Sequence, residues 1–212
     1  MLVVHHLNNS RSQRILWLLE ELGIEYEIKY YERDTQTMLA PESLRQIHPL
    51  GKSPVITDGD ITVAESGAIV EYLVSRYGNG RLIPAPDTPE RLRYTYWLHY
   101  AEGSAMPPLV MQLIFELFSI KSDAMEAFIA PQIKLHYDYI ESELSKNTWF
   151  SGSEFTAADI QMSFPVEMVA THPQEVENRP KLKEFLKHIH ARPAYKRAIE
   201  RGGKYDFGGG IQ

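Results

Sequence analysis

The chain has 212 residues, a formal net charge of −6, 43% hydrophobic and 24% charged residues, a composition typical of globular proteins that argues against disordered and fibrous classes. Lys and Arg are interspersed with Asp and Glu, and no apolar run approaches the roughly 20 residues of a membrane span, so neither a nucleic acid nor a membrane is an expected partner. The absence of cysteine fits a reducing, cytoplasmic compartment and excludes a mechanism that uses an enzyme thiol.

The first part of the chain predicts a strand, a helix and a second strand. Residues 2–4 form a short apolar run before a polar break, as in a buried strand that ends in a loop. Apolar residues then recur at helical spacing up to Gly23, which suits a helix C-terminus, and Ser10 or Ser12 can cap the helix start. Residues 26–31 are rich in Tyr and Ile and predict a strand beside the first.

A hairpin is predicted between two further helices. Residues 41–47 can form a short helix, and the apolar runs 54–57 and 61–64 flank the turn signal Asp58-Gly59-Asp60. From residue 65 to residue 77 the apolar spacing becomes helical. The element order β-α-β-α-β-β-α predicts a small mixed four-stranded sheet with helices on its faces.

A linker is predicted at residues 79–89, which contain Gly80 and three prolines but few large apolar residues. We therefore expect a first domain over residues 1–78 and a second over residues 90–212.

The second domain reads as helix throughout. Helices are predicted over residues 91–118, 129–144 and 182–189, and the first of these should bend or break at Pro107-Pro108 because proline lacks the backbone donor and clashes with the preceding turn. Thr156 and Asp159 have the spacing of a capping box. The glycine-rich tail, Gly202 to Gln212, is expected to be extended.

Two strings in the first domain carry a family resemblance. Pro49-Leu50-Gly51-Lys52-Ser53-Pro54-Val55, followed by Glu65-Ser66-Gly67-Ala68-Ile69, resembles the glutathione site of the cytosolic glutathione transferases. Ser10-Arg11-Ser12-Gln13-Arg14 and the string from Phe155 to Ile160 also match that family, and the likeness is to its serine-type bacterial and fungal members. The resemblance covers nearly the whole chain. It implies a thioredoxin-like first domain that binds glutathione, and an all-helical second domain that contributes the electrophile site.

The resemblance also implies how the cysteinyl and glycyl parts of glutathione are held. Pro54 would follow a cis peptide bond after Ser53, and the backbone of Val55 would pair with the cysteinyl backbone like an added strand. Lys52 would meet the glycyl carboxylate. Taken singly, these residues also suit a proline at a strand start and a solvated lysine.

At the other end of the tripeptide, Glu65 would bind the ammonium group and Ser66 the α-carboxylate, because the N–H groups at a helix N-terminus favour an anion. An ordinary helix cap with a neighbouring acid is the alternative reading of this pair. The spacing of all these residues together is what favours a glutathione site.

The reaction that the resemblance implies needs glutathione as its thiolate, which is the nucleophile. A free thiol titrates near pH ~8.5, so a shift of about two units requires about 2.7 kcal/mol of preferential stabilisation. Ser10 is the expected hydrogen-bond donor, with Asn9 as a second donor and Ser12 as an alternative. Arg11 would add positive potential or lie on the surface. No tyrosine occupies residues 8–12, which disfavours a tyrosine-type mechanism.

The electrophile is expected near the Pro107-Pro108 bend, where the candidate side chains are Tyr96, Tyr100, Met106 and Met111. Met and Tyr at helical spacing also serve as core residues. The eight histidines show no metal-ligand spacing, so no metal is expected.

The resemblance thus predicts a homodimeric detoxification enzyme that conjugates glutathione to a hydrophobic small molecule. A glutathione-dependent peroxidase, a non-catalytic ligand-binding or regulatory protein, and a protein-binding subunit stay open, because fold does not determine function. A Ser10→Ala variant separates the enzyme from the ligand-binding protein, since unchanged thiol absorbance at neutral pH and an unchanged conjugation rate would leave Ser10 no catalytic role. A protein-binding subunit predicts no retention on immobilised glutathione.

Overall fold

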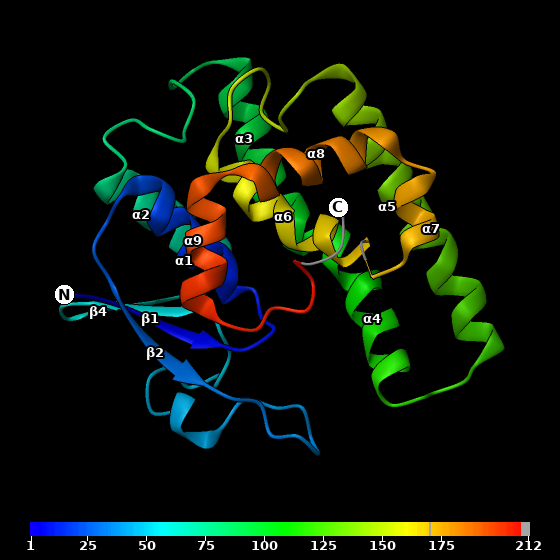
Figure 1. Ribbon diagram of the computed structural model, residues 1–212, viewed down its shortest axis with the longest axis horizontal. Coiled ribbons are helices and arrows are strands. Elements are labelled where there is room, and N and C mark those ends of the chain that lie inside the picture. The colour runs from blue at the N-terminus through cyan, green and yellow to red at the C-terminus, as the bar shows by residue number, and fades with distance from the viewer. Residues whose placement is uncertain (170, 209–212) are drawn as a thin grey trace. The chain divides into compact units, whose positions relative to one another are not determined.

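The computed structural model describes residues 1–169 and 171–208 (Figure 1). The described chain divides into two compact units, of which the first comprises residues 1–83 with residues 188–208 and the second residues 84–187.

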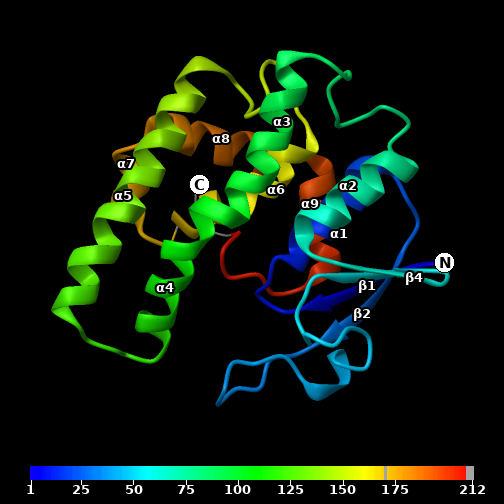
Figure 2. The same cartoon turned by 180° about the vertical axis from the view of Figure 1, so that it is seen from behind.

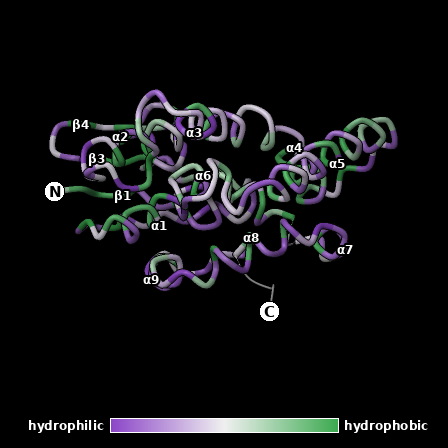
Figure 3. The backbone as a smooth tube through the Cα atoms, turned by 90° about the horizontal axis from the view of Figure 1, so that it is seen from above, coloured by the Kyte–Doolittle hydropathy of each residue, from purple (hydrophilic) through white to green (hydrophobic). Residues whose placement is uncertain are grey.

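The first unit contains the predicted mixed sheet of four strands, in the order β2-β1-β3-β4. The strands are β1 (Leu2–Leu7), β2 (Glu27–Tyr31), β3 (Val55–Asp58) and β4 (Ile61–Ala64). β1 and β2 are parallel because a helical crossover joins them, whereas β3 is antiparallel to both β1 and β4. The mixed sheet predicted from the element order and the thioredoxin-like arrangement implied by the resemblance are both confirmed. The tube around β1 begins in the hydrophobic colour, as expected for an inner strand (Figure 3).

Two helices of this unit follow the predicted pattern. α1 (Ser12–Leu22) is buried over most of its length and ends at Gly23, whose φ of 65° is the left-handed conformation expected of the cap. α2 (Ser66–Tyr77) follows the hairpin. The helix predicted over residues 41–47 is only a 3₁₀ turn, Glu42–Leu44.

The start of α1 differs from the prediction that Ser10 or Ser12 caps it. Arg11 occupies the N-cap position and its side chain makes no capping hydrogen bond. The Ser10 hydroxyl accepts from the backbone N–H of Ser12, the first residue of the helix, at 3.2 Å. The accepting side chain therefore belongs to the residue that precedes the N-cap. The loop therefore holds the Ser10 side chain against the first turn of α1.

Residues 188–208, which the boundary predicted at the linker assigns to the second domain, belong to the first unit. α9 (Pro193–Gly202) packs against α1. The carboxylate of Glu20 accepts from Arg197 Nε and Arg201 Nη1, each at 2.8 Å. These ion pairs join residues about 180 positions apart in the sequence, so no local pattern could have predicted them.

The second unit is helical, as predicted. Its helices are α3 (Pro89–Tyr100), α4 (Met106–Leu117), α5 (Asp123–Lys146), α6 (Ala157–Val169), α7 (Pro173–Glu177) and α8 (Pro180–Ala191), the last of which continues into the first unit. α4 and α5 form a helical hairpin (Figure 2). In the described part of the chain, none of the helices is both long enough and apolar enough to cross a membrane.

The predicted interruption of the first long helix is present, but it lies before the prolines. A π-helical turn, Ala101–Ala105, separates α3 from α4, and Pro107 and Pro108 are in the first turn of α4. The backbone stays helical between α3 and α4, and the π turn takes up the irregularity imposed by the two prolines, which lack an N–H donor.

Candidate active site

The Ser53–Pro54 peptide bond is cis, as the resemblance implied. Ser53 is held in place because its hydroxyl donates to the backbone carbonyl of His5 at 2.9 Å. Val55 begins β3 and its side chain is fully buried, whereas Lys52 is exposed on the loop before the cis bond. This loop thus presents a lysine to solvent close to the buried first residue of β3.

Glu65 and Ser66 lie where β4 meets the N-terminus of α2. Glu65 has φ 69° and ψ 119°, a conformation that costs a non-glycine residue about 1–3 kcal/mol. Its side chain is exposed, whereas Ser66 is buried and its hydroxyl accepts from Arg14 Nη2 at 3.4 Å. The strained backbone directs an exposed carboxylate and a buried hydroxyl to the same helix N-terminus.

Ser10 lies in the loop between β1 and α1, and its side chain joins that loop to the cis-proline loop. Its Oγ is 3.5 Å from Ser53 Oγ and 2.7 Å from Ser12 Oγ. Ser12 is completely buried, and its Oγ lies 2.9 Å from Nδ1 of the buried His6. Of the two serines, Ser10 retains the greater exposure, 5% against 0%.

Asn9, the second predicted donor, is engaged with the C-terminal segment. Its amide nitrogen donates to the Asp206 carboxylate at 2.7 Å, and its amide oxygen accepts from the Asp206 backbone N–H at 2.9 Å. Asn9 also has a positive φ of 48°. Both ends of the amide therefore serve to hold the loop.

Arg33 is a residue of this region that the sequence pattern did not indicate. It donates at 2.9–3.3 Å to three backbone carbonyl groups, those of Asn8, Asn9 and Met38. Burial and the nearby charge of Arg11, the partly buried N-cap of α1, lower the pKa of Arg33. Two guanidinium groups therefore place positive charge beside the Ser10 loop.

The buried imidazole of His6 makes the stability of the fold sensitive to acid. Burial lowers the pKa of His6 to about 4 from its ordinary 6.5, although the Gly202 carbonyl opposes the shift. Between pH 6.5 and pH 4 the unfolded chain therefore binds more protons than the folded chain. The free energy of unfolding should be highest above pH 6.5 and should fall by up to about 3 kcal/mol as the pH is lowered to 4.

Denaturant titrations from pH 7 to pH 4 on the wild type and on His6→Gln measure this contribution. The variant should lose less stability over that range. His5, whose pKa burial also lowers, is present in both proteins, so the difference between the two curves reports His6. Parallel curves would contradict the assignment.

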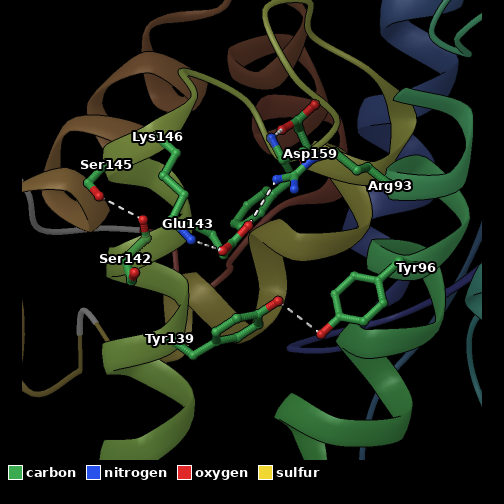
Figure 4. Close-up of polar contacts among 9 residues, drawn as sticks. Arg93, Tyr96, Tyr139, Ser142, Glu143, Ser145, Lys146 and Asp159 are labelled. Carbon is green, nitrogen blue, oxygen red and sulfur yellow. Dashed lines mark hydrogen bonds and ion pairs between the residues drawn. The ribbon is translucent and has the colours of Figure 1, made fainter. Parts of the chain in front are cut away.

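In the helical unit, the predicted electrophile residues occupy different environments. Tyr96 is 45% exposed, stacks on Tyr100 and donates from its hydroxyl to that of Tyr139 at 3.1 Å (Figure 4). Met106 is buried at 2% exposure, and Met111 on α4 is partly buried. None of the four predicted residues lines the cavity of about 450 Å³ between α4 and α5, which is bounded mainly by apolar side chains: Phe115, Ile120, Ile129 and Ile133.

The predicted capping box at the start of α6 is present. Asp159 is fully buried and accepts from the backbone N–H groups of Thr156 and Phe150, both at 2.8 Å, and from the Thr156 hydroxyl at 3.1 Å. Beside it, Glu143 bridges Arg93 and Lys146 (Figure 4). Within residues 1–169 and 171–208, no group of three or more His, Asp or Glu is arranged to hold a metal ion.

Comparison with known proteins identifies the family. Residues 1–75 match the family model for the glutathione S-transferase N-terminal domain, and residues 106–193 match the model for the glutathione S-transferase C-terminal domain. Glutathione S-transferase 3 of Schizosaccharomyces pombe is 37% identical, over 95% of this chain and 88% of the relative.

Two solved structures extend the likeness. A glutathione S-transferase from Actinobacillus pleuropneumoniae has a TM-score of 0.88 and 35% identity over 98% of this chain and 95% of that one. A glutathione transferase family member from Pseudomonas fluorescens, solved with two glutathione molecules bound, has a TM-score of 0.82 and 25% identity over 94% and 92% of the two chains. The chain described here therefore belongs to the glutathione S-transferase family and is an enzyme of that family.

Proposed function

We propose that this enzyme binds glutathione at the edge formed by the cis-proline loop and the N-terminus of α2, keeps its thiol ionised with the Ser10 hydroxyl, and directs the thiolate to a hydrophobic electrophile. The observation that supports this most is the 3.5 Å contact between the hydroxyl oxygens of Ser10 and Ser53, which brings the Ser10 loop next to the cis-proline loop within one unit. A sulfur bound beside Val55 would lie next to that contact.

Charge complementarity supports recognition of both ends of the tripeptide. Glu65 would bind the ammonium group and Ser66 the γ-glutamyl carboxylate, whose charge the N-terminus of α2 and the neighbouring Arg14 favour. The exposed Lys52 would meet the glycyl carboxylate, while Ser53, Pro54 and Val55 would frame the cysteinyl part by strand-like pairing.

Thiolate stabilisation would come from one hydrogen bond and the surrounding positive potential. A hydrogen bond to a charged group contributes about 1.5–3 kcal/mol, which is of the size that a two-unit lowering of a thiol pKa needs. The N-terminus of α1, together with Arg11 and Arg33, adds positive potential at the Ser10 loop.

The electrophile would be an apolar small molecule. In this proposal residues 1–78 bind glutathione and residues 90–212 contribute the second substrate site, through Tyr96, Tyr100, Met106 and Met111 on α3 and α4. Bringing an aligned thiolate next to an apolar electrophile accelerates conjugation by proximity and by control of the thiol pKa. We further propose a cytoplasmic homodimer with a role in detoxification.

Glu65→Gly tests the binding site, because it should change stability and affinity in opposite directions. Glycine tolerates the positive φ of residue 65, so the variant should unfold no more easily than the wild type and is expected to gain up to about 1 kcal/mol. Loss of the carboxylate should weaken glutathione binding, measured by calorimetry, about tenfold or more.

The matched control is Asp87→Gly, at another non-glycine residue with positive φ, 58°. This variant should bind glutathione with unchanged affinity. Wild-type affinity in Glu65→Gly would remove Glu65 from the proposed site.

A further inference from the structure

A chain of hydrogen bonds runs inward from Ser10 through Ser12 and His6 to the backbone carbonyl of Gly202. Its consecutive donor–acceptor distances are 2.7 Å between the two hydroxyls, 2.9 Å from Ser12 Oγ to His6 Nδ1, and 3.1 Å from His6 Nε2 to the carbonyl oxygen. Every group in the chain is buried. The position of each hydroxyl proton can be worked out from the carbonyl end.

The hydrogen bond to Gly202 determines the tautomer of His6. A carbonyl oxygen can only accept, so Nε2 carries a proton and donates it to Gly202. Burial lowers the pKa of His6 to about 4, so the ring is neutral near pH 7 and Nδ1 holds a lone pair. His6 Nδ1 is therefore an acceptor.

The Ser12 hydroxyl donates its proton away from Ser10. The acceptors next to Ser12 Oγ on this side are His6 Nδ1 at 2.9 Å and the Leu7 carbonyl at 3.3 Å, and neither can donate. Ser53 is committed in the same way, because its hydroxyl donates to the His5 carbonyl. In the 2.7 Å contact between Ser10 and Ser12, it is therefore Ser10 that donates, and the longer contact of Ser10 with Ser53, at 3.5 Å, holds no proton.

We propose that Ser12, oriented by His6, is a positioning residue that competes with the glutathione thiolate for the hydroxyl proton of Ser10. This inference rests on the proposed role of Ser10 as thiolate donor. When Ser10 turns its proton to sulfur, two oxygen atoms 2.7 Å apart are left with no proton between them, because the Ser12 hydroxyl continues to donate to His6 Nδ1. Ionisation of the bound thiol therefore carries the free-energy cost of breaking the hydrogen bond between Ser10 and Ser12.

The competition predicts an unusual sign for Ser12→Ala. Removing the competing acceptor should lower the pKa of the bound thiol by about half to one unit, the worth of one neutral hydrogen bond. The conjugation rate at pH 6 should accordingly rise about twofold to threefold, because a thiol with a pKa near 6.5 is already partly ionised there, with little change at pH 9. Ser12→Thr, which keeps the hydroxyl, should behave as the wild type.

The experiment is a pH titration of thiolate absorbance at 240 nm in the glutathione complexes of the wild type, Ser12→Ala, Ser12→Thr and Ser10→Ala. Ser163→Ala is the matched control, because Ser163 is a buried serine of α6 that donates to the Ile160 carbonyl. It should leave the thiol pKa unchanged.

The outcomes separate the two claims. If Ser10→Ala raises the thiol pKa and Ser12→Ala also raises it or leaves it unchanged, competition is refuted while the role of Ser10 stands. If Ser10→Ala has no effect, both claims fall.

A second measurement does not depend on the folding of Ser12→Ala. ¹⁵N NMR of the imidazole in the wild-type protein at pH 7 should show His6 protonated at Nε2 alone, with and without glutathione. An Nδ1–H tautomer or an imidazolium would overturn the proposal.

Discussion

Ser10→Ala should raise the pKa of the thiol of bound glutathione by about one to two units, because a hydrogen bond to a charged sulfur is worth about 1.5–3 kcal/mol. A pKa that moves from about 6.5 to about 8.5 lowers the thiolate fraction at pH 7 roughly 25-fold, and kcat/KM should fall by a similar factor. Stopped-flow titration of the thiolate absorbance and conjugation rates across pH 6–9 measure both quantities.

Affinity for S-methylglutathione provides the control for this variant. The methylated sulfur cannot ionise, so its dissociation constant should be the same in Ser10→Ala and in the wild type. An unchanged pH–rate profile in Ser10→Ala would exclude Ser10 as the donor. The remaining candidates from the sequence are less suited, because Ser12 is completely buried and the Asn9 amide is bonded to Asp206 at both ends.

Asp159→Ala should lower the free energy of unfolding by about 3–5 kcal/mol. Asp159 satisfies two backbone N–H groups and one hydroxyl at the start of α6, and each buried donor left without an acceptor costs about 1–3 kcal/mol. Burial raises the pKa of Asp159 to about 7 and the three hydrogen bonds oppose this shift, so part of the gain in hydrogen bonding is offset by the desolvation of the carboxyl group. Urea denaturation of the whole chain measures the loss.

Glu154→Ala is the matched control, because it removes an exposed acid from the same loop. It should change the free energy of unfolding by no more than about 0.5 kcal/mol. A loss below about 1 kcal/mol in Asp159→Ala would show that other groups hold the start of α6.

The elements that could be predicted from the sequence are those with local causes. The β3–β4 hairpin follows from the Asp58-Gly59-Asp60 turn signal, and the end of α1 follows from Gly23, the left-handed cap. The capping box of Thr156 and Asp159 spans only three residues. In each case the residues that determine the geometry are neighbours in the chain.

The contacts that could not be predicted join distant residues. Docking of α9 on α1 depends on Glu20 and Arg201, and anchoring of the Ser10 loop depends on Asp206 and on Arg33. The hydropathy of α9 resembles that of any surface helix, so its place in the first unit could not be read from the pattern.

The start of α1 was mispredicted because short polar residues suit several positions of a helix N-terminus. Ser10 and Ser12 are both residue types that commonly cap a helix. Their hydroxyl groups are hydrogen-bonded to each other, and Arg11, which lies between them in the sequence, occupies the N-cap position. In our proposal, the hydrogen bond between Ser10 and Ser12, which takes the place of the predicted cap, also sets the direction of the Ser10 proton.

An ultraviolet pH titration of glutathione bound to the unmodified enzyme addresses the proposed mechanism most directly, since it counts ionised sulfur in the complex itself. Half of the bound tripeptide should be ionised near pH 6.5, about two units below a free thiol. A midpoint close to pH ~8.5, the value for a thiol in water, would mean that the site receives glutathione without activating it.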